Sequence, residues 1–480
     1  MNLAGHVLFR GAASDDKIAL VVLSATGAER WSYGRLRDEV MRTAHGFRKR
    51  GLEAGDRALM RLGNSPEFAI VYLGAIAAGI VPVPTAAALG AEDITKIAAD
   101  LAPDLIVAHP GIALPDSDTP VVAPSDLLAP TPLAAPVEAE PDDPAYIVYT
   151  SGTSGQPLGV VHAHRAILAR QMMFDGWYGL TPEDRVLHAG AFNWTFTLGT
   201  GLLDPWTIGA TALVLADGTP LDLLPLLAKR HEATILAGAP GVFRRLLKTG
   251  LPALPHLRHG LAAGEKLSET LRHGWVEATG TELHEAFGQS ECSTFISGSP
   301  ARPAPEGSIG YTQKGRAVAI LAGDAPAKRG EMGEIAVHES DPGLFLGYLS
   351  KRREIRDGWH VTGDMGLMRE DGAIEYHGRN DDILTAGGYR VSPMDVEATM
   401  QKLDGVEEAA AVDHKVSDDT VLIALHYTGA KLEEAVLKAH AETTLARYKQ
   451  PRLFIHAQAL PRNPNGKLLR KALRAANDAP

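Results

Sequence analysis

The residues best suited to chemistry form one glycine- and hydroxyl-rich segment at 149–159, with the sequence Tyr-Thr-Ser-Gly-Thr-Ser-Gly-Gln-Pro-Leu-Gly. An apolar run at 145–148 precedes it and predicts a buried strand, and residues 164–168 after it predict the start of a helix. A strand, a Gly/Ser/Thr loop and a helix form a layout that binds phosphate, because glycines let backbone N–H groups approach the anion and hydroxyls add donors. A plain flexible connection is the alternative. Four hydroxyls among three glycines favour phosphate binding.

The segment differs from two other well-known loops. It does not end in Gly-Lys-Ser/Thr, which excludes a Walker A loop. Ser154 lacks the second flanking glycine of a nucleophile elbow, which excludes that kind of catalytic serine.

Four more motifs follow the loop in the chain. Together, in this order, they resemble the motifs of the adenylate-forming superfamily, which includes acyl-CoA synthetases, the adenylation domains of peptide synthetases and luciferase. The resemblance spans residues 149–467 and is closest to benzoate-type acyl- or aryl-CoA synthetases. The motifs are Glu285-Ala286-Phe287-Gly288-Gln289-Ser290-Glu291, Trp359-His360-Val361-Thr362-Gly363-Asp364, Gly378-Arg379-Asn380-Asp381-Asp382 and Pro461-Arg462-Asn463-Pro464-Asn465-Gly466-Lys467.

The resemblance implies an AMP-forming acid–thiol ligase. With MgATP such an enzyme activates a monocarboxylic acid to an acyl-adenylate, and it then transfers the acyl group to coenzyme A. ATP and coenzyme A are therefore the implied co-substrates, and Mg²⁺ the implied cofactor. The substrate supplies the nucleophile, so the protein needs mainly to position groups and stabilise charge, and no Ser-His-Asp set is required.

The resemblance also assigns residues to the nucleotide. Lys467 would bridge the carboxylate and the α-phosphate, although a solvated lysine in a basic tail is the plain alternative. Glu291 and Thr150 would hold Mg²⁺ through hard oxygen atoms. Glu285 occupies the place of an adenine-amino acceptor, where Asp or Asn is usual. The remaining ATP/AMP-binding candidates are Ser151, Gly152, Thr153, Ser154, Gly155, Gly264, Glu265, Phe287, Ser290, Asp364 and Arg379.

The acyl pocket is expected in segments that line it in the family. An aromatic wall in these segments suits a ring-bearing acid or a short chain, and we favour an aromatic monocarboxylate. The alternative is that the aromatic residues belong to the core. The candidates are Phe192, Asn193, Trp194, Ala239, Ala263, Gly264, Phe287 and Gly288.

The resemblance assigns two features to the rotation of the C-terminal domain between the two half-reactions. Asp381 resembles the family's hinge, which absorbs a large backbone rotation of the C-terminal domain. Gly387 and Gly388 would leave room for the pantetheine arm of coenzyme A, and a Gly-Gly turn between strands is the alternative.

One position departs from the family pattern. The family loop ends Pro-Lys-Gly, whereas this chain has Pro157-Leu158-Gly159, so a cation near the phosphates is missing. Two alternatives to the CoA ligase therefore stay open. One is a stand-alone adenylation enzyme that loads the phosphopantetheine of a carrier protein, and the other is a catalytically weakened adenylate-binding protein.

The elements that must position these residues alternate between helices and short strands. Helices are predicted at 33–50 and 66–79, and strands at 81–84, 105–108, 145–149, 212–215 and 234–236. This rhythm predicts an α/β fold with helix-covered mixed sheets in a large N-terminal domain, residues 1–380. Shorter strands from about residue 310 predict a small β subdomain. We predict that residues 381–480 form a small, mobile α+β C-terminal domain. Its helices are expected at 392–402 and 432–445, and its strands at 409–412 and 421–426.

Composition excludes several classes of partner. Lys and Arg total 47 against 58 Asp and Glu, and the net charge of −11 argues against general nucleic-acid binding. We expect no signal peptide and no membrane insertion, and we expect a cytoplasmic protein. The single Cys292 is expected to be a buried packing residue. His162 and His164 are expected to be polar residues at a helix start rather than metal ligands. Both a monomer and a homodimer fit the sequence.

Overall fold

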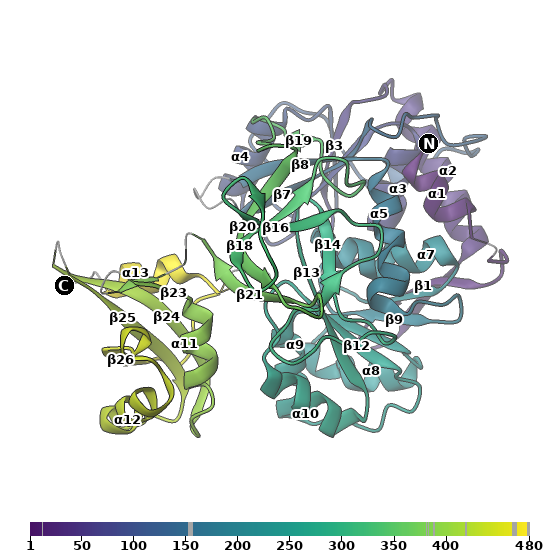
Figure 1. Ribbon diagram of the computed structural model, residues 1–480. Helices are drawn as coiled ribbons and strands as arrows, with labels where there is room; N and C mark the ends of the chain where they lie inside the picture. Colours follow the sequence, from purple (N-terminus) through teal and green to yellow (C-terminus); the bar gives the residue numbers. More distant parts are fainter. Residues whose placement is uncertain are drawn as a thin grey trace. The chain divides into compact units, whose positions relative to one another are not determined.

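The structure of the chain, a computed structural model, describes residues 1–11, 13–151, 157–380, 382, 384–386, 389–417, 420–462 and 468–477 (Figure 1). These residues form two units. Unit 1 comprises Met1–Val318 and Val337–His360, and unit 2 comprises Ala319–Ala336 and Val361–Pro480. None of the helices in the described part combines the length and apolarity needed to cross a bilayer.

A nine-stranded sheet forms the centre of unit 1, in the order β15-β14-β13-β12-β11-β9-β10-β1-β2. Its inner strands from β1 to β13 pair in parallel, and β2, β14 and β15 are antiparallel. The inner strands β1 and β10 are almost entirely apolar because both faces of the sheet are covered. The strands are β1 (Ile18–Leu23), β2 (Ala28–Ser32), β9 (Arg185–His188), β10 (Thr211–Leu215), β11 (Ile235–Gly238), β12 (His259–Ala263), β13 (Glu282–Gln289), β14 (Ser293–Ser297) and β15 (Tyr311–Thr312).

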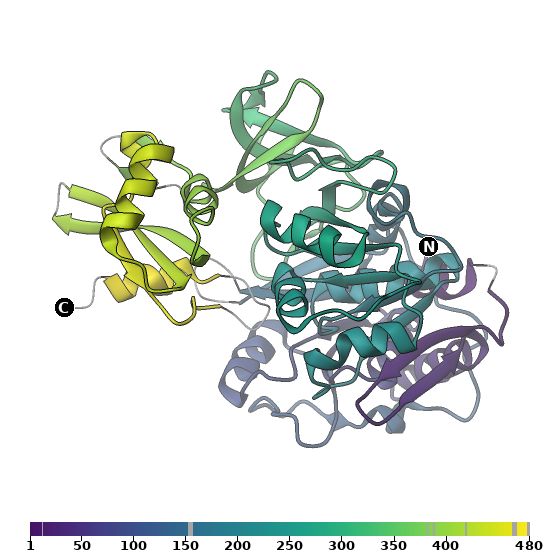
Figure 2. The same ribbon diagram turned by 90° about the horizontal axis from the view of Figure 1, so that it is seen from below.

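Helices cover this sheet on both faces. Leu187 packs in one core cluster with Phe243 and Trp275 of α9 and α10, whereas its neighbour Val186 packs in another cluster with Trp177. Successive strand residues therefore bury opposite faces. The helices that pack on the face of Leu187 form one layer, which Figure 2 shows in teal. The helices are α8 (Leu224–Arg230), α9 (Pro240–Thr249) and α10 (Glu269–Thr279) in that layer, and α1 (Leu3–Phe9), α5 (Ala166–Gln171), α6 (Thr195–Leu198) and α7 (Asp204–Ile208) elsewhere in unit 1.

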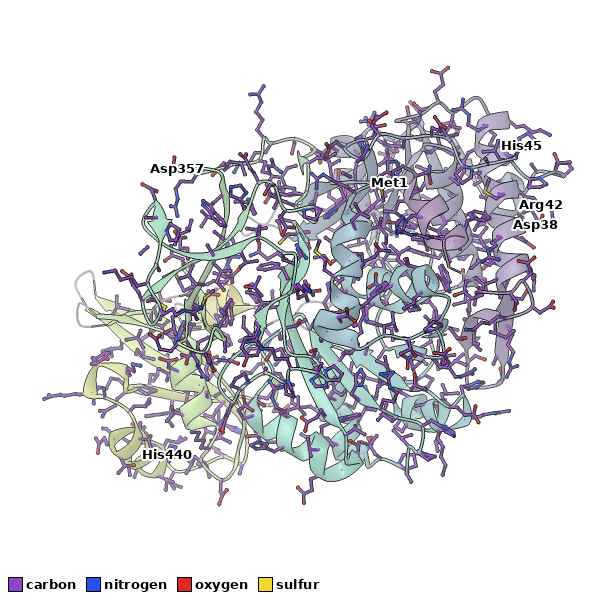
Figure 3. All side chains as sticks on the ribbon, turned by 45° about the vertical axis from the view of Figure 1, so that its right-hand side comes forward. Met1, Asp38, Arg42, His45, Asp357 and His440 are labelled. Atoms are coloured by element: carbon purple, nitrogen blue, oxygen red, sulfur yellow. The ribbon has the colours of Figure 1, made fainter. Side chains whose placement is uncertain are left out.

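A second, four-stranded parallel sheet has the order β4-β3-β5-β6. Helix α3 is apolar on nearly every side and buried, whereas α2 keeps an exposed polar face that carries Asp38, Arg42 and His45 (Figure 3). Ser32 and Ser65 cap the two helices. The elements are β3 (Arg57–Arg61), β4 (Val81–Pro84), β5 (Leu105–Ala108), β6 (Val121–Val122), α2 (Tyr33–Lys49), α3 (Pro66–Ala77) and α4 (Ala91–Leu101).

A third sheet of unit 1, in the order β19-β8-β7, contains a strand that the sequence analysis does not predict. The helix start predicted at 164–168 is confirmed, because α5 begins at Ala166, but a strand at 157–163 lies between the glycine-rich loop and that helix. The strand forms because the side chains of Val160, Val161 and His162 alternate between the two faces and the backbone pairs antiparallel with the strand before the loop. The strands are β7 (Pro144–Ser151), β8 (Pro157–Ala163) and β19 (Gly347–Tyr348).

Unit 2 contains a five-stranded sheet in the order β17-β16-β18-β20-β21, which matches the predicted small β subdomain. Its last part is an α+β assembly in which Val396, Leu425 and Leu437 share one core. The division of the chain at residue 381 stays a prediction. The elements are β16 (Val318–Ala322), β17 (Ala325–Pro326), β18 (Met332–His338), β20 (Trp359–Met368), β21 (Ile374–Arg379), β22 (Leu384–Ala386), β23 (Tyr389–Val391), α11 (Pro393–Met400), β24 (Val406–Ser417), β25 (Thr420–Gly429), α12 (Glu434–Thr444), β26 (Leu453–His456) and α13 (Arg470–Asn477).

Candidate active site

The glycine-rich loop joins the antiparallel strands β7 and β8. Thr150, at the end of β7, pairs directly with Leu158 of β8. Residues paired in this way point to the same face of a sheet, so Leu158 lies beside the predicted Mg²⁺ ligand. Several predicted residues lie outside the described part of the chain, namely Gly152, Thr153, Ser154, Gly155, Asp381, Gly387, Gly388, Lys467 and the side chain of Ser151.

The second motif runs along β13 into a tight hairpin with β14. Gly288 packs so closely that a Cβ atom there would lie 2.1 Å from the carbonyl oxygen of Ser293. The pairing of the two strands shifts between Phe287 and Gly288. Phe287 is half-buried, and its ring contacts the ring of Phe295 edge to face at 5.4 Å. The glycine is therefore required for the two strands to approach, and it brings Ser290 and Glu291 to the turn.

Glu291 is half-buried and is held by a segment distant in the sequence. Its carbonyl oxygen accepts a hydrogen bond from the Phe345 N–H at 2.8 Å. Its Oε1 accepts a hydrogen bond from the hydroxyl of Tyr348 at 3.0 Å. In the described residues the structure gives no partner to Oε2 of Glu291.

Buried groups fix the backbone on both sides of Glu291. The Nε2 of His162 donates to the carbonyl oxygen of Ser290 at 2.7 Å. Arg316 donates to the carbonyl oxygens of Cys292 and Thr294 at 2.9 and 2.7 Å, and it forms an ion pair with Asp341 in which both side chains are 0% exposed. The turn therefore has little freedom to move. Cys292 is buried, as expected.

Of the two histidines after the loop, His164 lies just before helix α5, as expected, whereas His162 does not lie at a helix start. His162 lies in β8, and its ring stacks on Tyr146 at 4.6 Å. The Nδ1 of His164 accepts a hydrogen bond from the Leu3 N–H at 3.0 Å. Burial lowers the pKa of each imidazole to about 4. Both side chains are thus structural residues before the helix, and no group of three or more metal-ligating side chains occurs among the residues that the structure describes.

Glu285 has partners within the protein. Its Oε1 accepts a hydrogen bond from the Leu267 N–H at 2.8 Å, and its Oε2 lies 3.4 Å from Nη2 of Arg272. Burial raises the pKa of Glu285 to about 7, although Arg272 opposes this shift. The carboxylate therefore fastens the segment that follows Gly264, and its predicted contact with adenine stays a prediction.

Three residues predicted for the acyl pocket lie close together around Gly264. The residue has a φ of +98°, and a Cβ atom there would lie 2.7 Å from the indole of Trp194. Ala263 belongs to the core cluster against which Trp194 packs. Glu265 lies beside these residues, with its carboxylate 3.6 Å from Arg244 of α9. A flat indole thus lies against the glycine backbone at Gly264.

The other pocket candidates are distributed differently. Phe192 is 1% exposed and packs against Phe68 at 5.0 Å, so it belongs to the core. Asn193 is half-buried on the chain between Phe192 and Trp194, and Ala239 is half-buried as the residue before α9. Large aromatic residues are often buried in the core, and this rule would have predicted that Phe192 is a core residue rather than a pocket residue.

In unit 2, two of the predicted ATP/AMP-binding residues are neighbours. Asp364 of β20 pairs with Arg379 of β21, and Nη1 of Arg379 lies 3.7 Å from Oδ2 of Asp364. The hydroxyl of Tyr376 donates to Oδ1 of Asp364 at 2.9 Å. Antiparallel pairing therefore brings the third and fourth motifs side by side, with the buried Asp364 next to Arg379.

The residues that flank Lys467 are fixed by ion pairs. Arg462 lies 3.0 Å from Glu408. Arg470, at the start of α13, pairs with Glu397 of α11, with Nη2 3.0 Å from Oε2. The described residues on both sides of Lys467 are thus joined to unit 2 by ion pairs.

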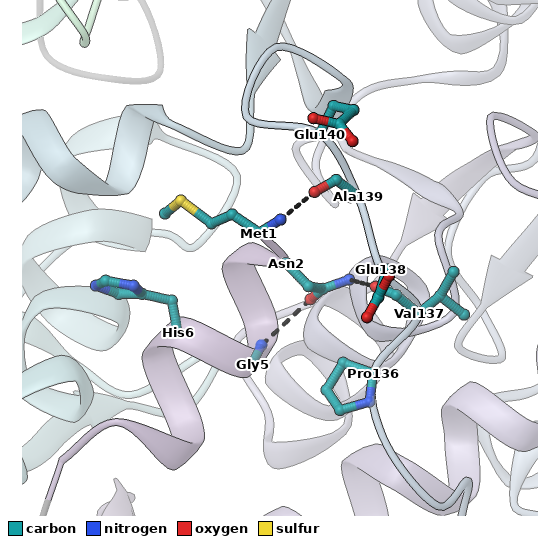
Figure 4. A pocket seen from close by; sticks show the side chains of 9 residues that line it. All are labelled: Met1, Asn2, Gly5, His6, Pro136, Val137, Glu138, Ala139 and Glu140. Carbon is teal, nitrogen blue, oxygen red and sulfur yellow. Dashed lines mark hydrogen bonds between the residues drawn. The ribbon is translucent and has the colours of Figure 1, made fainter.

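A pocket of about 500 Å³ lies elsewhere, at the N-terminus (Figure 4). Asn2 fixes its wall by donating to the carbonyl oxygens of Ile76 and Val137 at 2.8 and 3.0 Å. None of its lining residues belongs to a predicted site. The lining residues are Met1, Asn2, Gly5, His6, Pro136, Val137, Glu138, Ala139 and Glu140.

Comparisons with known proteins agree on one family. Residues 9–349 match the model of the AMP-binding enzyme family. The chain is 30% identical to the 3-hydroxybenzoate–CoA ligase of Aromatoleum sp. (strain CIB), over 93% of this chain and 92% of that protein. It is 30% identical to the 3-hydroxybenzoate–CoA/4-hydroxybenzoate–CoA ligase of Thauera aromatica, over 92% and 91%. The crystal structure of ATP-bound MatB from Rhodopseudomonas palustris superimposes with a TM-score of 0.88 at 25% identity, covering 100% of this chain and 99% of that one.

Proposed function

Because the chain belongs to the AMP-binding enzyme family, we propose that it is an AMP-forming carboxylic acid–CoA ligase that acts on an aromatic monocarboxylate. The observation that carries the proposal is the match, over more than nine-tenths of both chains, to two hydroxybenzoate–CoA ligases. Two observations support it: Glu291 accepts a hydrogen bond from Tyr348 on one carboxylate oxygen, and the indole of Trp194 lies against the backbone of Gly264.

The proposed reaction has two steps. A carboxylate oxygen of the acid attacks the α-phosphorus of ATP, the bond to pyrophosphate breaks, and an acyl-adenylate forms. The sulfur of coenzyme A then attacks the acyl carbon, the thiol proton is released, and AMP leaves. Both nucleophiles belong to substrates, so the protein acts by positioning them and by offsetting the charge that develops.

Mg²⁺ would be held by Glu291 and Thr150. Both offer hard oxygen atoms, and Glu291 has one carboxylate oxygen that no described residue occupies. Mg²⁺ usually takes one or two protein ligands and completes its shell with phosphate oxygens and water, so this donor set fits the ion. When bound, the ion would neutralise charge on the phosphates.

The other nucleotide contacts follow from the motifs. Asp364 and Arg379 would bind the ribose, and Phe287 would stack on the adenine. Lys467 would bridge the carboxylate and the α-phosphate in the first step. Rotation at Asp381 would then exchange Lys467 for the face that carries Gly387 and Gly388, through which the pantetheine arm would reach the acyl-adenylate.

The choice of an aromatic acid rests on Trp194 and on the relatives. The indole of Trp194 lies against the backbone of Gly264 and packs on the cluster that contains Ala263, and a ring of the acid would stack on this indole. Both reported relatives are named for hydroxybenzoates. We therefore propose benzoate and its hydroxylated forms as the substrate class.

The test is acid-dependent formation of AMP from MgATP and coenzyme A, with benzoates, phenylpropenoates and short-to-medium fatty acids as substrates. The chain and its Leu158→Lys variant are assayed together, because position 158 shares a face with Thr150. We expect AMP and an aryl-CoA from the unmodified chain, and a lower KM for ATP in the variant.

Other results would select another function. Activity in Leu158→Lys alone would support an adenylate-binding protein that the missing cation has weakened. Pyrophosphate exchange without any CoA product would favour transfer to the phosphopantetheine of a carrier protein. The absence of AMP formation with every acid and both acceptors would refute the ligase.

A further inference from the structure

Segment 345–348 contacts Glu291 at two points. The Phe345 N–H donates to the Glu291 carbonyl at 2.8 Å, and the Tyr348 hydroxyl donates to Oε1 at 3.0 Å. The rings of Phe345 and Tyr348 also contact each other edge to face at 4.9 Å. The ring packing limits the rotation of the tyrosine, so its hydroxyl has a defined direction.

The backbone of Tyr348 is fixed to the strand that returns from the glycine-rich loop. Gly347 and Tyr348 of β19 pair with Val161 and Val160 of β8. The Leu346 and Leu349 N–H groups extend this contact, donating to the carbonyl oxygens of Val161 and Gly159, each at 2.8 Å. The hydroxyl that contacts Glu291 is therefore carried by the same three-stranded sheet as Thr150.

The backbone at Glu291 leaves the carboxylate as the part that can still turn. His162 holds the Ser290 carbonyl, and Arg316 holds the Cys292 carbonyl. A glutamate side chain retains several rotamers even when its backbone is fixed, and ordering it costs free energy at the moment of metal binding. A donor on one carboxylate oxygen removes part of that cost in advance.

We propose that Tyr348 is a positioning residue for Glu291, and that its hydroxyl holds Oε1 so that Oε2 is presented to the cation bound with ATP. The inference rests on the proposed function, because it needs Glu291 to contact the metal. It adds a residue outside all five sequence motifs, and it links the metal ligand to the sheet that carries the phosphate loop.

The test compares Tyr348→Phe with the unmodified chain. The phenylalanine keeps the ring contact with Phe345 and removes only the hydroxyl. Calorimetric titration gives the affinity for ATP without Mg²⁺, with saturating Mg²⁺ and with Mn²⁺. We expect the affinity for the metal–ATP complex to fall about tenfold, as for the loss of a hydrogen bond to a charged group, and the affinity for metal-free ATP to stay unchanged.

A matched control separates positioning from stability. Tyr33→Phe removes a buried hydroxyl that donates to the Ala210 carbonyl at 2.6 Å in the same unit, away from Glu291. We expect its metal dependence to equal that of the unmodified chain. A purely structural role for Tyr348 would lower affinity for ATP equally with and without Mg²⁺.

The outcomes separate the two proposals. Equal metal dependence in Tyr348→Phe and the unmodified chain would overturn the role of Tyr348 and leave the ligase intact. An unmodified chain that binds no ATP under any condition would overturn both proposals. A tenfold loss that occurs only in the presence of the metal would support the positioning role, whichever acid the enzyme activates.

Discussion

At the scale of single residues, Glu285 and Glu291 belong to one motif yet have opposite surroundings. Glu285 is 2% exposed and is bound by Leu267 and Arg272, whereas Glu291 is half-buried and meets the hydroxyl of Tyr348. Burial raises the pKa of Glu285 to about 7, with Arg272 acting against it. One carboxylate is thus part of the scaffold, and the other remains accessible to a ligand.

The raised pKa of Glu285 predicts a pH-dependent stability. Below the unfolded-state value of 4.5, Glu285 is protonated in both states and its contribution is fully present. As the pH rises through 7, the unfolded chain has already lost the proton and the folded chain resists losing it, so stability is lost. Between pH 5 and pH 8, the unmodified chain should lose about 2 kcal/mol of unfolding free energy relative to Glu285→Gln, because glutamine does not titrate. Urea titration at both pH values measures this.

Exposed Glu277 of α10 provides the control for that experiment. Its replacement by glutamine should shift stability by the same small amount at both pH values. If the difference between Glu285→Gln and the unmodified chain also stays constant, the carboxylate is ionised throughout and the assigned shift is wrong.

Tyr348 and His162 show why the sequence predicts only part of the site. They contact Glu291 and Ser290 across 57 and 128 positions of the chain. A lone tyrosine or a histidine in an apolar strand carries no local pattern that indicates such a contact. The motifs could be recognised because their residues are adjacent, whereas the groups that orient them are brought together only by folding.

At the scale of elements, the β13–β14 hairpin positions the second motif, and Gly288 sets how closely its strands approach. A methyl group at Gly288 would lie 2.1 Å from Ser293 O and 2.5 Å from Thr294 Cα. We expect Gly288→Ala to lower the free energy of unfolding by roughly 1–3 kcal/mol, because backbone must move to admit the atom. Activity should fall further than stability alone explains, since the turn carries Glu291. Thermal unfolding and steady-state kinetics test the two effects.

Gly241 of α9 is the matched position. It is exposed, and nothing lies within 4 Å of the place where its Cβ would stand. Gly241→Ala should leave stability unchanged or raise it by up to about 1 kcal/mol, because alanine favours the helix. Equal effects of the two substitutions would show that the crowding at Gly288 is not what makes glycine necessary there.

The elements themselves could be predicted where their signals are local. The helix predicted at 33–50 is α2 (Tyr33–Lys49), and the one predicted at 392–402 is α11 (Pro393–Met400). Strand β8 was missed because Pro157 and Gly159 weaken a strand by local rules. Its pairing with β7, which no local rule includes, overrides that weakness.

At the scale of the whole molecule, unit 1 buries an unusual set of neutral imidazoles. Burial lowers the pKa of His162, His164 and His259 to about 4, and that of His188 and His284 to about 3. Hydrogen bonds agree with the neutral form, since Nδ1 of His188 accepts from the Gly190 N–H at 3.0 Å. The unfolded chain would bind protons near pH 6.5 that the folded chain does not bind.

These histidines therefore predict acid sensitivity of the opposite sign to that of Glu285. Their contribution is present above pH 6.5 and is lost as the pH falls toward 4, because the unfolded state takes up protons. Each buried imidazole should lower the free energy of unfolding by about 2 kcal/mol when the pH falls from 7 to 5.

We expect His188→Asn, whose amide oxygen can still accept from Gly190, to lose less stability than the unmodified chain over that interval, even if it is less stable at pH 7. Exposed His273→Gln on α10 should keep the original slope. Thermal melts of the three proteins at constant ionic strength decide the matter, since parallel curves for His188→Asn and the unmodified chain would mean that His188 is protonated within the fold.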